Sequence, residues 1–138
     1  MTRNLQNLLE MDNKEIALQA ITDVFGNRDV TAFDRYFAEN YQQHNPLFPN
    51  GTEALRQFVP NLPADFKYTR GIVAANGDIV MIHGRYENWS GKNMIGVDIF
   101  RVKDGKITEH WDVLQEEVPK EKSVNGNAMF PIVGGPTS

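Results

Sequence analysis

The sequence predicts an α+β fold in which helices cover one face of a curved, mostly antiparallel sheet. Up to about residue 60, apolar side chains recur at helical spacing, and from Phe66 onward they alternate with a period of two. Turn sequences divide the second half at Asn76-Gly77, Ser90-Gly91 and Lys103-Asp104-Gly105. Helices followed by a meander of strands are typical of a helical layer packed on a sheet.

Each expected element has its own boundary signals. A helix is expected at about 14–25, after a cap at Asp12 or Asn13, and shorter helices are expected at 32–37 and 52–59. The segment between the last two helices is expected to be a loop. Four strands of similar length are expected at about 66–75, 78–88, 93–102 and 106–115.

Length and composition indicate one domain over residues 1–138, with a polar lead-in at 1–12 and an irregular tail at 117–138. The net charge of −4 and the pI near 5.3 argue against a nucleic-acid partner. The absence of cysteine excludes a disulfide, a thiol nucleophile and a cysteine-ligated zinc. No segment has the length of a membrane span. We therefore expect a soluble, cytoplasmic protein with neither nucleic acid nor membrane as a partner.

The chain has three histidines, His44, His83 and His110, and each lies near a carboxylate or an amide in the sequence. Histidine changes charge near neutral pH, so a cluster of the three with acids would be suited to proton transfer. A two-residue turn at Ser90-Gly91 would place His83 opposite Asp98.

The next hairpin allows two registers. A two-residue turn at Asp104-Gly105 would pair Asp98 with Trp111, whereas a three-residue turn with a glycine bulge would pair Asp98 with His110. The second is preferred because the first would leave His110 and Asp112 among aliphatic side chains without partners.

The preferred register predicts a row of His83, Asp98 and His110 across three strands, with Asp112 on the same face. Opposed side chains in a sheet have Cβ atoms ~4.5–5.5 Å apart, close enough for hydrogen bonds. Apolar side chains are expected to line the pocket around this row: Phe25, Phe33, Phe58, Met81, Phe100 and Leu114. A structural His–Asp pair on a solvated face is the simpler alternative, and an apolar wall with convergent ionisable groups favours a small-molecule site.

Two further points stay open from the residues alone. His44 lies in an expected loop, where a histidine is more often a surface residue than a catalytic one. Three histidines and an aspartate could also bind zinc or iron, but the chain contains neither His-x-His nor His-x₃-His, so no metal is expected.

The segment from Gly96 to Gln115 resembles the SnoaL-like polyketide cyclase family of the nuclear transport factor 2-like superfamily. Its block reads Asp-Ile-Phe-Arg, then Asp-Gly-Lys-Ile and Glu-His-Trp-Asp. Tyr41 to Pro46 and the tail segment Gly126 to Phe130 are also similar, although members more often have Asn-Gly-Met-Phe in the tail. The resemblance covers nearly the whole chain.

The resemblance implies a cone-shaped α+β barrel with acid–base residues on the concave side of the sheet. Cyclases of this family close a ring by an aldol reaction without cofactor or metal, using a carboxylate–histidine pair. His110 and Asp112 fall in the matching block, and Asp98, His83 and His44 would surround them. The superfamily also contains isomerases, dehydratases, epoxide hydrolases and proteins that only bind, so the reaction transfers less well than the fold.

We therefore expect a cofactor-independent lyase, isomerase or cyclase that acts next to the carbonyl of a small hydrophobic molecule. His110 or His83 would be the base, Asp98 would fix its tautomer, and a second histidine or a protonated Asp112 would donate to the enolate oxygen. The alternatives are a protein that only binds a hydrophobic ligand and, less favoured, a metal-assisted hydrolase.

A homodimer is expected through the outer face of the sheet, because the helices cover only the other face. The preferred register places apolar residues there that a monomer would expose: Val80, Ile82, Tyr86, Ile95, Val97, Ile99, Ile107, Trp111 and Val113. The alternative is that the C-terminal tail folds back over this face.

Overall fold

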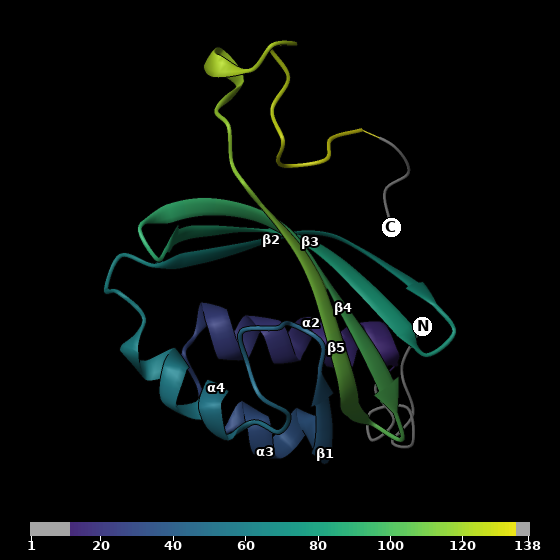
Figure 1. The fold of residues 1–138 in the computed structure, drawn as a ribbon. Helices are drawn as coiled ribbons and strands as arrows, with labels where there is room; N and C mark the ends of the chain where they lie inside the picture. The colour runs from purple at the N-terminus through teal and green to yellow at the C-terminus, as the bar shows by residue number, and fades with distance from the viewer. Residues whose placement is uncertain (1–11, 135–138) are drawn as a thin grey trace.

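The computed structural model describes residues 12–134 and contains one five-stranded sheet with helices on one side of it (Figure 1). The strand order is β1-β5-β4-β3-β2, in which β1 runs parallel to β5 and all other neighbours are antiparallel. The strands are β1 (Phe37–Gln43), β2 (Lys67–Asn76), β3 (Ile79–Trp89), β4 (Lys92–Lys103) and β5 (Lys106–Glu116). The predicted α+β class is confirmed, and the four predicted strands lie within one residue of their expected bounds.

The helical layer also follows the sequence signals. Helix α2 (Asn13–Ile21) begins after Asp12, whose carboxylate accepts a hydrogen bond from the Glu15 backbone N–H at 2.9 Å, and a π-helical turn, Thr22–Gly26, continues it. Helices α3 (Ala32–Tyr36) and α4 (Glu53–Phe58) complete the layer. These helices lie on the concave side of the sheet (Figure 1), and their buried side chains form one core with those of the strands.

Strand β1 was not predicted, because Phe37 was expected to end a helix and residues 38–43 were expected to belong to a loop. It pairs with β5 so that Gln43 lies beside His110. Its sequence, Phe-Ala-Glu-Asn-Tyr-Gln-Gln, buries only Tyr41 fully. With one buried position, the segment carries no clear period-two pattern.

The predicted register of β3 and β4 is wrong by one residue. Trp89 pairs with Lys92 across the turn as expected, but a bulge before Trp89 shifts the ladder, so His83 lies opposite Val97 instead of Asp98. The extra residue is accommodated at Asn88, which has a φ of 59° and whose side chain accepts from the Gly91 N–H at 3.1 Å. A shift of one residue moves every side chain of β3 to the opposite face.

The register of β4 and β5 differs from both alternatives. Asp104 and Gly105 form a two-residue turn with φ values of 52° and 77°, and a bulge at Thr108 then shifts the ladder. Asp98 therefore pairs with Asp112, and not with His110 or Trp111. The two-residue turn and the bulge at Thr108 each shift the pairing by one residue from the preferred register. Because the total shift is two residues, Asp98, His110 and Asp112 still lie on the same face, as predicted.

The outer face of the sheet is less apolar than expected. Val80, Ile82, Tyr86 and Ile107 belong to the buried core instead. The outer positions form rows such as Met81–Ile99–Trp111 and His83–Val97–Val113. The C-terminal tail lies on this side of the sheet (Figure 1). Its Phe130 packs on His83 with ring centroids 5.4 Å apart.

No helix within residues 12–134 is long and apolar enough to cross a membrane.

Candidate active site

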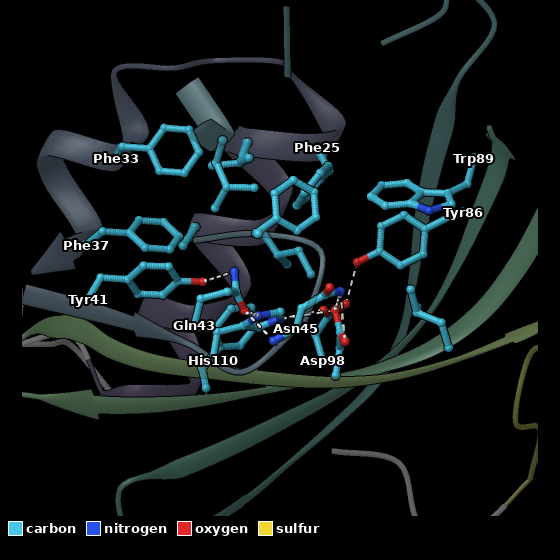
Figure 2. A pocket seen from close by; sticks show the side chains of 18 residues that line it. Phe25, Phe33, Phe37, Tyr41, Gln43, Asn45, Tyr86, Trp89, Asp98 and His110 are labelled. Atoms are coloured by element: carbon cyan, nitrogen blue, oxygen red, sulfur yellow. Dashed lines mark hydrogen bonds and ion pairs between the residues drawn. The ribbon is translucent and has the colours of Figure 1, made fainter. Parts of the chain in front are cut away.

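A pocket lies between the helical layer and the concave face of the sheet, with about 590 Å³ of unfilled space including its mouth (Figure 2). Its upper walls are apolar and come mainly from α2, the π-helical turn and α3. Its floor is formed by polar side chains of β1, β3, β4 and β5 and of the loop after β1. The described residues that line it are Ala20, Ile21, Val24, Phe25, Phe33, Phe37, Tyr41, Gln43, Asn45, Phe48, Leu55, Tyr86, Trp89, Asp98, Phe100, His110, Asp112 and Leu114.

Asp98 and His110 form a buried pair at the centre of the floor. His110 Nε2 lies 2.8 Å from Asp98 Oδ1, and the two residues are only 8% and 3% exposed. The hydroxyl of Tyr86 donates a short hydrogen bond to the other oxygen, Asp98 Oδ2 (Figure 2). Two donors therefore hold the Asp98 carboxylate, as a buried charge requires.

Gln43 fixes the other side of the imidazole. Its Oε1 lies 2.6 Å from His110 Nδ1 and also accepts the Asn45 backbone N–H at 3.2 Å. The Gln43 amide nitrogen donates to the Tyr41 hydroxyl at 3.1 Å, so both ends of the amide are assigned by their partners. Because an acceptor faces Nδ1, that nitrogen carries a proton, and a second proton lies between Nε2 and Asp98.

Asp112 is the carboxylate of the floor that His110 does not hold directly. Its Oδ2 is 3.9 Å from His110 Nε2, and its two oxygens accept hydrogen bonds from Asn45 Nδ2 at 3.1 and 2.9 Å. Burial raises the pKa of Asp112 above its ordinary value, while the hydrogen bond from Asn45 and the nearby His110 oppose that shift. Asp112 is thus a partly desolvated carboxylate that lines the pocket.

The two tyrosines of the floor remain neutral. Burial, together with the charge of Asp98, raises the pKa of the Tyr41 and Tyr86 hydroxyls well above the ordinary value near 10. Both phenols therefore act as hydrogen-bonding groups without charge.

Most of the predicted site residues meet in this pocket. Asp98, His110 and Asp112 share the floor as expected, and the predicted wall residues Phe25, Phe33, Phe100 and Leu114 line it. Phe58 lies behind the wall, where it packs on Phe48 and Trp89 with centroid separations of 5.2 and 5.4 Å.

His83 and Met81 lie on the opposite face, which corrects the predicted row. The bulge near Asn88 turns both side chains outward, so Met81 is 43% exposed and His83 packs under Phe130. Tyr86, and not His83, is the β3 side chain that hydrogen-bonds to Asp98.

His44 also lies outside the pocket. Its Nε2 is 2.6 Å from Glu109 Oε2, and its ring stacks on Trp111 with centroids 4.6 Å apart and planes 5° from parallel. Glu109 and Trp111 alternate with His110 along β5, so they belong to the outer face. The hydrogen bond from His44 holds the pKa of Glu109 below its ordinary value.

Sequence reasoning missed Tyr41, Gln43, Asn45 and Tyr86. A signal was present in the first three, because residues 41, 43 and 45 alternate with His44 and fall on one face once the segment is extended. The position of Tyr86 in the pocket could be predicted only with knowledge of the bulge at Asn88. The left-handed backbone of Asn88 is common for asparagine.

Asp98, His110 and Asp112 are also the residues that could bind a metal ion. One ligand atom from each lies within 4.8 Å of the others, which suits a small divalent cation. An ion there would have to replace the 2.8 Å hydrogen bond between His110 and Asp98. That bond already uses the ligand atoms, so the geometry fits a hydrogen-bonded acid–base centre better.

The profile of the SnoaL-like domain family matches residues 18–110, which is more than half of the chain. The chain belongs to the SnoaL-like domain family. No curated relative matches this SnoaL-like protein significantly.

Solved structures with the same fold are distant in sequence. An NTF2-like protein of unknown function from Cytophaga hutchinsonii superposes with a TM-score of 0.65 at 17% identity, covering 83% of this chain and 95% of that one. A candidate polyketide cyclase from Acidithiobacillus ferrooxidans gives 0.61 at 19%, covering 74% and 87%. A candidate ketosteroid isomerase from Kribbella flavida gives 0.62 at 18%, covering 88% and 83%. At these identities the likeness establishes the NTF2-like fold and no particular reaction.

Proposed function

We propose that this SnoaL-like protein is a cofactor-independent enzyme that removes a proton next to the carbonyl of a small hydrophobic molecule, as a cyclase, isomerase or lyase does. The observation that carries the proposal is the floor of the pocket, where Asp112 lies 3.9 Å from the buried His110–Asp98 pair beneath an apolar wall. Desolvated groups that exchange protons in a dry pocket are characteristic of such chemistry.

Asp112 is the base in this proposal, which differs from the expectation that a histidine would be. Both ring nitrogens of His110 are engaged, Nδ1 by Gln43 and Nε2 by Asp98, so the imidazole has no free lone pair for a substrate proton. Asp112 has free lone pairs, and burial raises its pKa toward the range in which a carboxylate accepts a proton well.

His110 supplies the donor. When the Cα–H proton of the substrate moves to an Asp112 oxygen, the electron pair of the C–H bond forms a C=C bond and the π pair of the C=O bond moves to the carbonyl oxygen, which gives an enolate. The proton that lies between His110 Nε2 and Asp98 can then be donated to that oxygen instead of to Asp98. The Tyr86 hydroxyl continues to donate a hydrogen bond to Asp98. In a cyclase, the enolate carbon next attacks a second carbonyl of the substrate, and the resulting alkoxide takes up the proton held by Asp112. In an isomerase, a conjugated dienolate takes that proton back from Asp112 at a different carbon of the conjugated system.

The structural neighbours support this class without choosing within it. A candidate polyketide cyclase and a candidate ketosteroid isomerase share the fold, and both names imply proton transfer next to a carbonyl.

Deuterium exchange tests the proposal without knowledge of the natural substrate. Hydrophobic ketones such as 2-tetralone are incubated in D2O, and loss of the α-proton signal is followed by NMR. We expect the wild type to accelerate exchange and Asp112→Asn to lose about 10²–10⁴-fold of that acceleration. Asp104→Asn is the matched control, because residue 104 lies in a hairpin turn that asparagine tolerates. Equal rates for Asp112→Asn and wild type would refute the role of Asp112.

A binding protein of the same fold is the second candidate. It is favoured by one observation, that Gln43, Asn45, Asp98 and His110 all have partners within the protein before any ligand enters. Under this alternative, ketones would bind in the pocket while their α-protons exchange at the rate in buffer alone.

A further inference from the structure

We propose that the pocket selects its ligand by the sign of charge, so that it takes molecules whose polar end is uncharged or cationic and rejects carboxylates and phosphates. The inference names the substrate class of the proposed site and rests on the charges of the residues that line it. Binding tests it separately from turnover.

Acidic groups outnumber basic ones in the lining. Asp98 and Asp112 supply two carboxylates, and His110 is the only basic side chain among the described residues that line the pocket. Even as an imidazolium, His110 can balance only one of the two acids. The tyrosines contribute no charge, because burial keeps them protonated.

The arginines of the described residues are directed elsewhere. Arg101 is held by Asp78 and Glu109, and Arg85 by Glu117, both on the outer side of the sheet. On the helical side, Arg35 and Arg56 are bound by aspartates. The remaining two, Arg28 and Arg70, donate to backbone carbonyls, and neither lines the pocket. A ligand anion in the pocket would therefore find no guanidinium to pair with.

The side-chain amide donors of the floor are already used within the protein. Both amide groups that could bind an anion already donate, Gln43 to the Tyr41 hydroxyl and Asn45 to Asp112. To pair with these amides, an entering carboxylate would have to break their bonds, and it would lie among apolar walls, where charges are weakly screened. A cation would instead meet an unbalanced carboxylate and aromatic faces such as Trp89 and Phe25.

Three ligands that share a naphthyl group and differ in charge distinguish an effect of the sign of the charge from the general cost of dehydrating any charge. They are 1-(2-naphthyl)propan-2-one, 1-(2-naphthyl)propan-2-amine and 2-naphthylacetate, measured by calorimetric titration at pH 7, where the amine is cationic and the acid anionic. We expect the amine to bind at least as tightly as the ketone, and the acid at least about tenfold more weakly than the ketone, a difference of ~1.4 kcal/mol.

Asp112→Asn removes the unbalanced charge, so the gap between acid and ketone should close, whereas Asp104→Asn should leave it unchanged. Acid binding as tight as ketone binding in the wild type would overturn the proposal. So would an amine that binds as weakly as the acid, because the cost would then come from burying any charge. Charge selectivity without deuterium exchange would support this inference while refuting the proposed reaction, and exchange without selectivity would do the reverse.

Discussion

The hydrogen bond from Tyr86 to Asp98 should contribute measurably to folding, and the chain contains its own control. Tyr86→Phe removes only a hydroxyl, so it opens almost no cavity. It leaves one oxygen of the buried Asp98 carboxylate without its donor. Hydrogen bonds to charged groups are worth about 1.5–3 kcal/mol, so we expect a loss of about 2 kcal/mol in the free energy of unfolding.

Tyr68→Phe is the control. Tyr68 pairs with Tyr86 across β2 and β3 and is similarly buried, but its hydroxyl has no hydrogen-bond partner among the described residues. Removing an unsatisfied buried hydroxyl should cost nothing and could stabilise the protein by up to about 1 kcal/mol.

Urea unfolding at pH 7, followed by tryptophan fluorescence, distinguishes the two variants. With an m-value of about 2 kcal/mol/M, a loss of about 2 kcal/mol lowers the midpoint by about 1 M for Tyr86→Phe, while the Tyr68→Phe midpoint stays or rises. In the Asp98→Asn background, Tyr86→Phe should cost less than in the wild type. Equal midpoint shifts for the two tyrosine variants would show that Tyr86 does not hold Asp98.

Three further predictions concern acidity, the outer histidine and assembly. Because burial raises the pKa of Asp112, the folded state binds the proton of this carboxyl more tightly than the unfolded state does. As pH rises above the unfolded pKa of ~3.9, the wild type should therefore lose stability relative to Asp112→Asn. The difference between their urea midpoints should be larger at about pH 7 than at about pH 4. His44→Ala should cost at most about 1 kcal/mol in unfolding free energy, because the His44 side chain is 43% exposed, and it should leave α-proton exchange within a few-fold of wild type. The homodimer remains a prediction, and sedimentation of the wild type should give twice the chain mass of 15.7 kDa. Val113→Glu, which places a charge on an outer side chain that is 67% exposed, should reduce the mass to 15.7 kDa. A monomeric wild type would contradict the prediction.

The sequence predicted the sheet well because its strands alternate strongly and its turns carry clear signals. The grouping of Asp98, His110 and Asp112 on one face also followed from patterning, since any other grouping buries an acid without a partner. The pairing within that face did not follow. A bulge such as the one at Thr108 changes register without changing the hydrophobic pattern that a sequence displays.

The second bulge had a larger effect. Asn88 adds one residue to β3, so His83 lies on the outer face and Tyr86 is the β3 side chain that hydrogen-bonds to Asp98. Similarly, β1 was not recognised, so Gln43 and Asn45 were overlooked and His44 was expected in the pocket. Each error concerns where a chain changes direction or gains a residue, and tertiary packing decides these points more than local sequence does.

The face on which the active site lies can be tested with two histidines that undergo the same substitution. His110→Gln alters the floor of the pocket, and His83→Gln alters the outer face beneath Phe130. In the α-deuterium exchange of 2-tetralone, His110→Gln should lose about 10²-fold or more of the acceleration, while His83→Gln should match the wild type. If His83→Gln abolished exchange and His110→Gln preserved it, the Asp98–His110–Asp112 site would be contradicted.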